Sequence, residues 1–130
     1  MGPRFPTYGG NDRTHYIRVP DDNRIELRGG DGAANPYLAA ASVIGAGLAG
    51  IDRDLDPGTP GGDNGTRREE LPRTLLHAVE ALERDETIRS VLDSAGEGVA
   101  SYFADYKKEE FLRWHAQVNS WEIDRYLTAF

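Results

Sequence analysis

The sequence predicts an α+β fold, in which an antiparallel β-hairpin precedes a mostly helical region. Polar and apolar side chains alternate over residues 13–28, and a turn signal interrupts them, which is typical of a hairpin. From residue 71 onward, apolar side chains recur every three or four positions, as they do along the buried side of helices. A chain of 130 residues can form one modest domain.

The hairpin has two different faces. Its turn lies at Pro20–Asn23, and residues 1–12 before it contain Pro, Gly and Asn, which predict an irregular lead-in. On one face of the second strand lie Ile25 and Leu27. The other face carries charged side chains spaced by two, joined by an Arg of the first strand and preceded by another at its start. These are Arg24, Glu26 and Arg28, with Arg18 and Arg13.

A helix is predicted over residues 35–51. Asn35 can cap it, and Pro36 suits its first position because the N–H that Pro lacks is not needed there. The helix is apolar on nearly every side, so we expect it to be buried. Its run Gly45–Gly50 matches G-x-G-x-x-G, but a dinucleotide site needs a preceding strand, so close helix packing is the better interpretation. Residues 52–70 are rich in Asp, Gly and Pro and predict a long acidic loop.

Helices are predicted over most of residues 71–130. The first begins near Pro72 and a shorter one spans residues 86–92. Two apolar stripes follow, offset by one residue, which predicts a bend or break near Glu109. Asn119 or Ser120 can cap a last helix that runs through Tyr126.

Composition limits the classes of function. The chain has a net charge of −7, which argues against general nucleic-acid binding. It has no Cys, no long apolar run and no secretory signal, so we expect a cytoplasmic protein without membrane spans. Residues 1–28 differ from the acidic remainder, since they hold five Arg against four acidic residues. This end of the chain is therefore suited to anions.

The charged face of the hairpin is the main candidate site. Arg side chains bind phosphate oxygens in pairs, and a Glu can hold Mg²⁺ or Mn²⁺. The alternative is a solvated face on which cross-strand Arg–Glu pairs give modest stability. Gly29–Gly32 could cradle an anion or form a flexible turn, and the turn is favoured. His15, His77 and His115 have no metal-ligand spacing, and Trp114 and Trp121 favour a core or interface position.

Several segments resemble, in order, the motifs of the glutamine synthetase family. Tyr-Gly-Gly-Asn-Asp-Arg-Thr-His-Tyr-Ile-Arg-Val-Pro at residues 8–20 resembles N-R-x-x-x-I-R-[IV]-P, and Arg-Ile-Glu-Leu-Arg at residues 24–28 resembles R-[IF]-E-x-R. Further matches are Asp-Gly-Ala-Ala-Asn-Pro-Tyr-Leu at residues 31–38, Ala-Gly-Leu-Ala-Gly-Ile at 46–51, Leu-Pro-Arg-Thr-Leu-Leu at 71–76 with Ala-Leu-Glu-Arg-Asp at 81–85, and Trp-Glu with Tyr at 121–126. The wording of the first segment is most similar to the type III-like and γ-glutamylmethylamide synthetase subgroup.

The resemblance implies an ATP-dependent ligase that joins the γ-carboxylate of glutamate to ammonia or a small amine through γ-glutamyl phosphate. It implies that Arg13 contacts glutamate and the ATP phosphates and that Arg18 and Arg24 bind ATP phosphates. Arg28 would bind glutamate and help to neutralise the phosphoryl group, so Arg13 and Arg28 are the catalytic candidates. Glu26 would bind Mg²⁺ or Mn²⁺.

The resemblance also implies that residues 1–130 are the C-terminal portion of the catalytic domain. They divide into a hairpin site region (1–34), the helix (35–51), the acidic loop (52–70) and the helical region (71–130). The hairpin would belong to an incomplete catalytic barrel, without the family's N-terminal domain and the other metal-binding glutamates.

The sequence departs from the family at Gly29–Gly30, at Ala49 in place of a common Asp, and at Gly61–Gly65. We therefore expect a chain that is inactive alone and works with a complementary ligase chain or in a homo-oligomer. The alternative is a non-catalytic partner or relic that joins a ligase oligomer through its helices. A helical interaction module unrelated to ligases is a further, weaker alternative.

Overall fold

The computed structural model describes residues 3–61, 70–127 and 129. It divides into two compact units, Met1–Pro72 and Arg73–Phe130, and each is described by itself. Residues 62–69, which include most of the predicted Gly-rich departure and part of the acidic loop, lie outside the described residues. The predicted α+β class is confirmed, since three strands precede five helices among the described residues.

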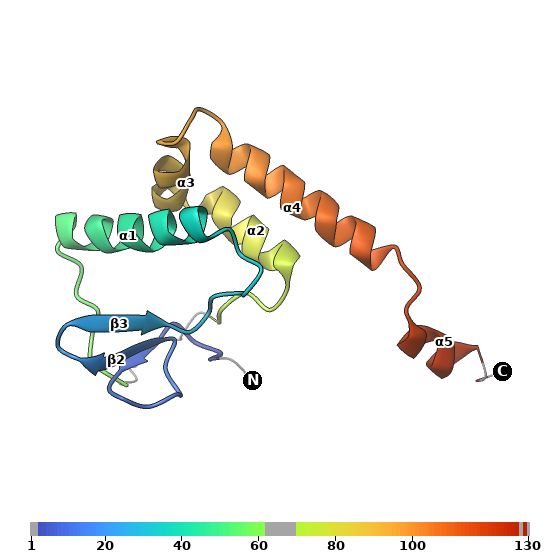
Figure 1. Cartoon of the computed structure of the whole chain (residues 1–130), viewed down its shortest axis with the longest axis horizontal. Helices are drawn as coiled ribbons and strands as arrows, with labels where there is room; N and C mark the ends of the chain where they lie inside the picture. The colour runs from blue at the N-terminus through green and yellow to red at the C-terminus, as the bar shows by residue number, and fades with distance from the viewer. Residues whose placement is uncertain (1–2, 62–69, 128, 130) are drawn as a thin grey trace. The chain divides into compact units, whose positions relative to one another are not determined.

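The first unit contains a small sheet of order β1-β2-β3 (Figure 1). Strands β2 (Ile17–Asp21) and β3 (Arg24–Leu27) form the predicted antiparallel hairpin. The turn between them is fastened by Asp21, whose Oδ1 accepts the N–H of Asn23 at 3.0 Å. Pro20 lies where the register shifts between Arg18 and Asp21, so its missing N–H costs no ladder bond there.

Two details of the predicted hairpin are wrong. The first strand begins at Ile17 rather than near residue 13, because residues 10–16 form bends, in which the Thr14 N–H is bonded by the Asp12 side chain and the Asp12 N–H by the Gly10 carbonyl. The lead-in also contains a strand, β1 (Tyr8–Gly9), which pairs with β2 in parallel. A two-residue strand has no alternation that sequence could show.

Helix α1 (Pro36–Asp52) begins as predicted. The side chain of Asn35 accepts the N–H groups of Tyr37 at 3.0 Å and Leu38 at 3.2 Å, and Pro36 is the first helical residue. The prediction that this helix is buried is wrong, since none of its residues is buried. Within the described part of the first unit, no strand packs against α1 to cover its apolar side chains.

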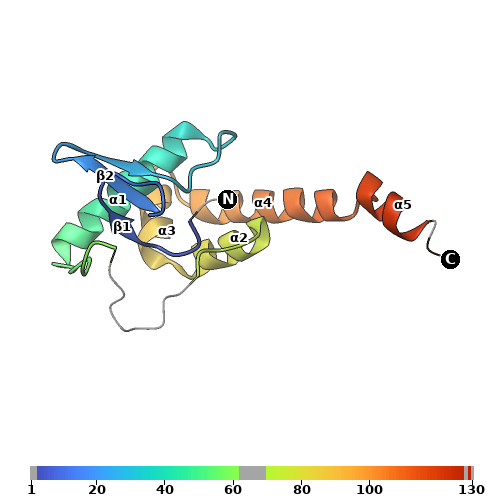
Figure 2. The ribbon, with the colours of Figure 1, turned by 90° about the horizontal axis from the view of Figure 1, so that it is seen from below.

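The second unit has a small core between helices. Helices α2 (Leu75–Arg84) and α3 (Glu86–Asp93) both pack on α4 (Val99–His115), as Figure 2 shows from below. The core consists of Val79, Leu92, Ala100 and Ala104. The two Ala side chains allow α2 and α4 to approach closely.

The observed caps show where these helices begin, which differs from the prediction for α2 and agrees with it for the last helix. Helix α2 begins at Leu75 rather than near Pro72, because Thr74 caps it by accepting the N–H of His77 at 3.2 Å. The predicted break near Glu109 is wrong: α4 is continuous, and Glu109 forms an ion pair with Arg113 one turn later at 2.5 Å. Helix α5 (Ser120–Tyr126) has the predicted Asn119 cap and the predicted end.

Among the described residues, no helix combines the length and apolar character needed to cross a bilayer.

Candidate active-site face

Arg18 and Glu26 lie opposite each other on β2 and β3, so the hairpin brings both side chains to one face. The Nη1 atom of Arg18 donates to Oε2 of Glu26 at 2.5 Å. The side chain of Arg18 is only 22% exposed, whereas that of Glu26 is 41% exposed. The Nη2 atom of Arg18 also donates to Oδ1 of Asn11, which ties the β1–β2 loop to this face.

Two guanidinium nitrogens near this face lack a partner. Nε of Arg18 and Nη1 of Arg28 are buried atoms without a hydrogen bond to the described part of the chain. Arg28 lies just after β3, where its backbone N–H donates to the carbonyl of Tyr16 at 2.9 Å. A buried donor without an acceptor typically costs about 1–3 kcal/mol. These two Arg side chains therefore have hydrogen-bonding capacity for an anion.

Arg24 and Arg13 are placed differently from Arg18. Arg24 is spaced for the same face, but its Nε donates to Oδ2 of Asp21 at 3.0 Å and its side chain is 62% exposed at the turn. Arg13 is exposed in the bends before β2 and makes no hydrogen bond or ion pair with the described residues. The structure thus brings Arg18 and Glu26 together, with Arg28 just after the strand. Arg13 and Arg24 are exposed to solvent.

A hydrogen-bonded loop holds the segment around Arg13. Asp12 Oδ1 accepts the N–H of Thr14 at 2.8 Å and its hydroxyl at 2.5 Å, and these two bonds lower the pKa of the Asp12 carboxyl. His15 adds an ion-pair contact, with Nε2 at 3.2 Å from Oδ2 of Asp12, and its Nδ1 lies 3.3 Å from Oγ1 of Thr7. The loop conformation therefore depends on polar side chains rather than on a strand.

Glycines make room for rings beside this loop. A Cβ atom at Gly9 would overlap the imidazole of His15, and one at Gly29 would overlap the ring of Tyr16. Gly61 also approaches His15, with a Cβ position 3.4 Å from Cε1. Sequence reasoning missed these contacts, although the glycines at 9 and 29 are the signal that could have indicated them. His15 was expected to be packed or beside a substrate, and its ring is largely covered.

The Gly29–Gly32 segment forms a turn, the favoured interpretation. Asp31 fastens it, since its Oδ1 accepts the N–H of Ala33 at 2.8 Å and its carbonyl accepts that of Ala34 at 3.1 Å. The Gly45–Gly50 run lies inside α1, as expected, rather than between a strand and a helix. His77 and His115 are exposed on helices.

A divalent cation would find only one of its ligands on this face. Mg²⁺ needs about six oxygen ligands in a near-octahedral arrangement. Glu26 offers one carboxylate, already paired with Arg18, and the described residues contain no cluster of three or more His, Asp or Glu side chains suited to a metal. A complete metal site therefore does not fit the described residues of this chain alone.

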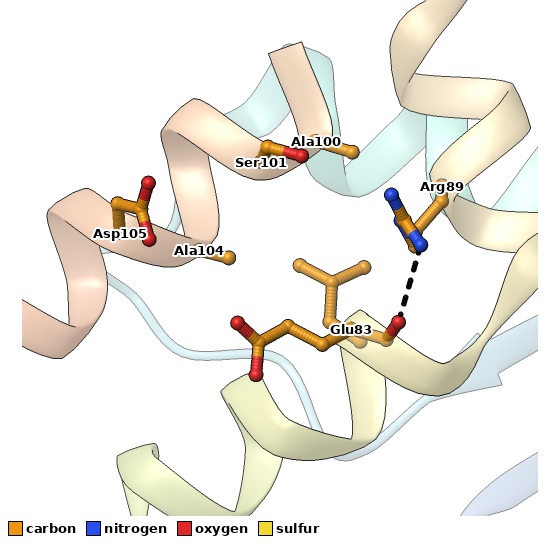
Figure 3. A pocket seen from close by; sticks show the side chains of 7 residues that line it. Glu83, Arg89, Ala100, Ser101, Ala104 and Asp105 are labelled. Carbon is orange, nitrogen blue, oxygen red and sulfur yellow. Dashed lines mark hydrogen bonds between the residues drawn. The ribbon is translucent and has the colours of Figure 1, made fainter. Parts of the chain in front are cut away.

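The second unit has a separate hollow of about 310 Å³ between α2, α3 and α4. Its charged side chains are Glu83, Arg89 and Asp105 (Figure 3). Arg89 Nη1 donates to the carbonyl of Glu83 at 3.3 Å, and the Glu83 carboxylate pairs with Lys108 at 2.5 Å. No residue predicted for the active site lines this hollow.

Comparison with known proteins identifies the family to which this fold belongs. The family model described as glutamine synthetase, catalytic domain, matches residues 1–126. The chain therefore belongs to the glutamine synthetase family, as the sequence motifs predicted.

Two curated relatives illustrate the similarity. The chain is 40% identical to the glutamine synthetase of Halobacterium salinarum, over 98% of this chain and 31% of the relative. It is 39% identical to the glutamate–methylamine ligase of Methyloversatilis universalis, over 98% of this chain and 30% of the relative. The chain thus spans under a third of the length of either relative.

Similarity to solved structures supports the same family assignment. A structure of apo GmaS without ligand superposes with a TM-score of 0.83 at 41% identity, covering 98% of this chain and 31% of that one. A GmaS/ADP complex superposes with a TM-score of 0.84 at 42% identity, covering 97% of this chain and 30% of that one. The backbone described above is therefore also found within a chain about three times as long.

Proposed function

We propose that this chain supplies one face of the active site of an ATP-dependent ligase, which joins the γ-carboxylate of glutamate to ammonia or a small amine. The observation that carries the proposal is the Arg18–Glu26 pair, together with the guanidinium nitrogens of Arg18 and Arg28 that have no hydrogen-bond acceptor, in a chain of the glutamine synthetase family. Phosphoryl transfer depends mainly on positioning and on neutralising charge, which are tasks for Arg side chains and a divalent cation.

Each predicted residue has a role in this proposal. Arg13, Arg18 and Arg24 bind the ATP phosphates, and Arg13 and Arg28 bind glutamate beside the phosphoryl group. Arg13 and Arg24 are exposed, so both have the freedom to reach a substrate that arrives from solvent. Glu26 would supply one oxygen ligand to Mg²⁺ or Mn²⁺, and the bound cation would help to neutralise the charge of the phosphates.

The proposed reaction has two steps. A γ-carboxylate oxygen of glutamate attacks the terminal phosphorus of ATP and ADP leaves, which gives γ-glutamyl phosphate. The nitrogen of ammonia or an amine then attacks the acyl carbon, phosphate leaves and the nitrogen loses a proton. Both acceptors are proposed because relatives named glutamine synthetase and glutamate–methylamine ligase match the chain at similar identity.

This face needs the rest of the catalytic fold. We call that remainder the complementary portion, meaning the part of a family member outside the segment that aligns with this chain. It would supply the other oxygen ligands that one Glu cannot provide. In this proposal the chain alone does not turn over, and activity requires the complementary portion or a homo-oligomer that contains it.

The test is complementation. The complementary portion would be prepared from the Methyloversatilis universalis relative with its aligned segment removed, and phosphate release from ATP would be measured with glutamate, methylamine or ammonia, and Mg²⁺ or Mn²⁺. We expect activity only in the mixture. Glu26→Ala and Arg18→Ala should each lower it by about 10²–10³-fold, the usual effect of removing one charge-stabilising group.

Arg113→Ala is the matched control, because Arg113 forms an exposed ion pair on α4 of the second unit and no motif predicts a role for it in the site. It should leave turnover unchanged. An assembled mixture without activity, or one in which Arg18→Ala and Glu26→Ala have no effect, would contradict the proposal. That outcome would favour the alternative of a non-catalytic partner, for which the exposed Trp114 and Trp121 of the last two helices offer contact surfaces.

A further inference from the structure

Helices α2, α3 and α4 of the second unit line the hollow of about 310 Å³ described above. Helix α4 contributes two pairs of residues spaced by four, and each pair follows one side of the helix. Ala100 and Ala104, which are 1% and 2% exposed, form the floor. Ser101 and Asp105 lie one position further around and are exposed at the rim. Because the floor residues are small, they leave a space of a size that binds small molecules.

The charges of the hollow are separated by sign. Arg89 reaches it from α3, whereas the carboxylates of Glu83 and Asp105 come from α2 and α4. Figure 3 shows Arg89 on one side of the hollow and Asp105 on the other, with Ala104 between them. The hollow therefore has a cationic side and an anionic side, joined by an apolar floor.

Arg89 retains most of its hydrogen-bonding capacity. Its Nη1 atom donates to the carbonyl of Glu83 at 3.3 Å, which is longer than a typical N–H···O bond. This bond holds the guanidinium beside the end of α2, and Arg89 makes no ion pair with a carboxylate of the described residues. The other N–H groups of its fork are therefore available to a carboxylate from solution, which Arg binds through two parallel hydrogen bonds.

The anionic side is also incompletely paired. The Glu83 carboxylate pairs with Lys108 at 2.5 Å, but the Asp105 carboxylate makes no hydrogen bond or ion pair with the described residues. The pKa of the Lys108 amine is raised, mainly by its hydrogen bond to Glu83 and further by the negative charges near it, which include Asp105. Asp105 therefore lies where negative charge gathers, and it can accept hydrogen bonds from a second cation.

We propose that this hollow binds a small zwitterion, an α-amino acid with a short side chain. The carboxylate of the ligand pairs with Arg89, its ammonium group pairs with Asp105, and its side chain contacts the floor of Ala100 and Ala104. None of these residues is predicted to bind ATP, glutamate or a metal. The site is therefore additional to the active-site face, and it does not depend on the ligase reaction.

Ligands with a single charge fit the hollow less well. A simple anion would pair with Arg89, but it would meet the carboxylates of Glu83 and Asp105. A simple amine would pair with Asp105, but it would leave Arg89 without a partner and would be repelled by Lys108. Both sides of the hollow are satisfied together only by a ligand that carries both charges.

Three ligands that differ only in their charged groups test the proposal. L-alanine has both charges, propionate has only the carboxylate, and ethylamine has only the ammonium group. Each would be titrated into the isotopically labelled full chain and followed by NMR. We expect L-alanine to cause saturable shifts at the amides of Arg89, Ser101 and Asp105, with a Kd on the order of 1 mM. Propionate and ethylamine should bind at least about tenfold more weakly, because each lacks one charge-assisted interaction.

Variants on two different helices locate the site. Arg89→Gln and Asp105→Asn should each weaken the binding of L-alanine by about tenfold or more. Arg113→Gln is the matched control, because its ion pair with Glu109 lies on α4 outside the hollow. It should bind like the parent chain. If circular dichroism shows that Arg89→Gln loses helix content, the exposed Asp105→Asn carries the test.

Two kinds of result would overturn the proposal. Shifts that do not saturate with L-alanine, or equally tight binding of propionate or ethylamine, would show a hydrated surface hollow without a specific ligand. Binding of L-alanine that persists in Arg89→Gln and Asp105→Asn but is lost in Arg18→Gln would place the amino acid on the hairpin face instead.

Discussion

His15 lies so close to the backbone of Gly9 that a Cβ there would come within 2.9 Å of Cε1 and nearer still to other ring atoms. We therefore expect Gly9→Ala to displace the ring and loosen the pairing of Gly9 with Arg18. Amide exchange of Ile17, whose N–H donates to the Thr7 carbonyl at 2.9 Å, should become faster by about tenfold or more, as overpacking of about 1–3 kcal/mol allows.

Gly10→Ala is the matched control, because a Cβ at Gly10 meets nothing within 4 Å among the described residues. It should leave the exchange of Ile17 unchanged. Unchanged exchange in Gly9→Ala as well would show that His15 has room to move and that the contact does not order the loop.

Some contacts between residues could be predicted from the sequence and others could not. The facing of Arg18 and Glu26 follows from the alternation and the turn position, because strands that pair through a short turn have a restricted register. The contacts of His15 with Gly9 and of Tyr16 with Gly29 depend on the path of the irregular segments, which carries no periodicity. The roles of Arg13, Arg24 and Arg28 toward substrates remain predictions.

At the scale of elements, local sequence signals predicted the helix starts well, whereas features that depend on tertiary contacts were not predicted. Asn35 and Asn119 cap the helices for which they were proposed, because capping depends on a few neighbouring N–H groups. Strand β1 was not predicted, because it is defined only by its pairing with β2. Helix α1 was expected to be buried, but apolar composition indicates only that a helix should be covered, and not that this chain covers it.

The contact of α2 with α4 depends on small side chains. Ala104 is 2% exposed on α4, and we expect Ala104→Leu to destabilise the second unit by about 1–3 kcal/mol through overpacking. Urea unfolding followed by far-UV circular dichroism measures the change in midpoint. Ser101→Leu adds a similar side chain beside the open hollow and should cost less; an equal shift would mean that α2 and α4 separate readily.

At the scale of the whole molecule, the buried apolar residues are unevenly distributed. Val79, Leu92, Ala100 and Ala104 give the second unit a core, while the described part of the first unit has no buried apolar side chain. Local stability follows buried apolar contacts, so the two units should open with different free energies. The first unit holds the proposed active-site face, so we expect the complementary portion to order this face as well as to supply ligands.

Hydrogen exchange measured by mass spectrometry on the isolated chain and on the mixture tests this difference. In the isolated chain, peptides from β2, β3 and α1 should exchange much faster than peptides from α2 and α4. Adding the complementary portion should slow exchange in the hairpin and in α1 by at least tenfold, because the exposed side chains of Ile25, Ile44 and Leu48 become covered, and should change exchange in the core beside α2 little. Replacing Ile44 and Leu48 by Asp should remove that protection, whereas Glu26→Ala should keep it. Protection confined to the second unit, or strong protection of α1 before mixing, would contradict the idea that the first unit is completed by another part of the catalytic fold.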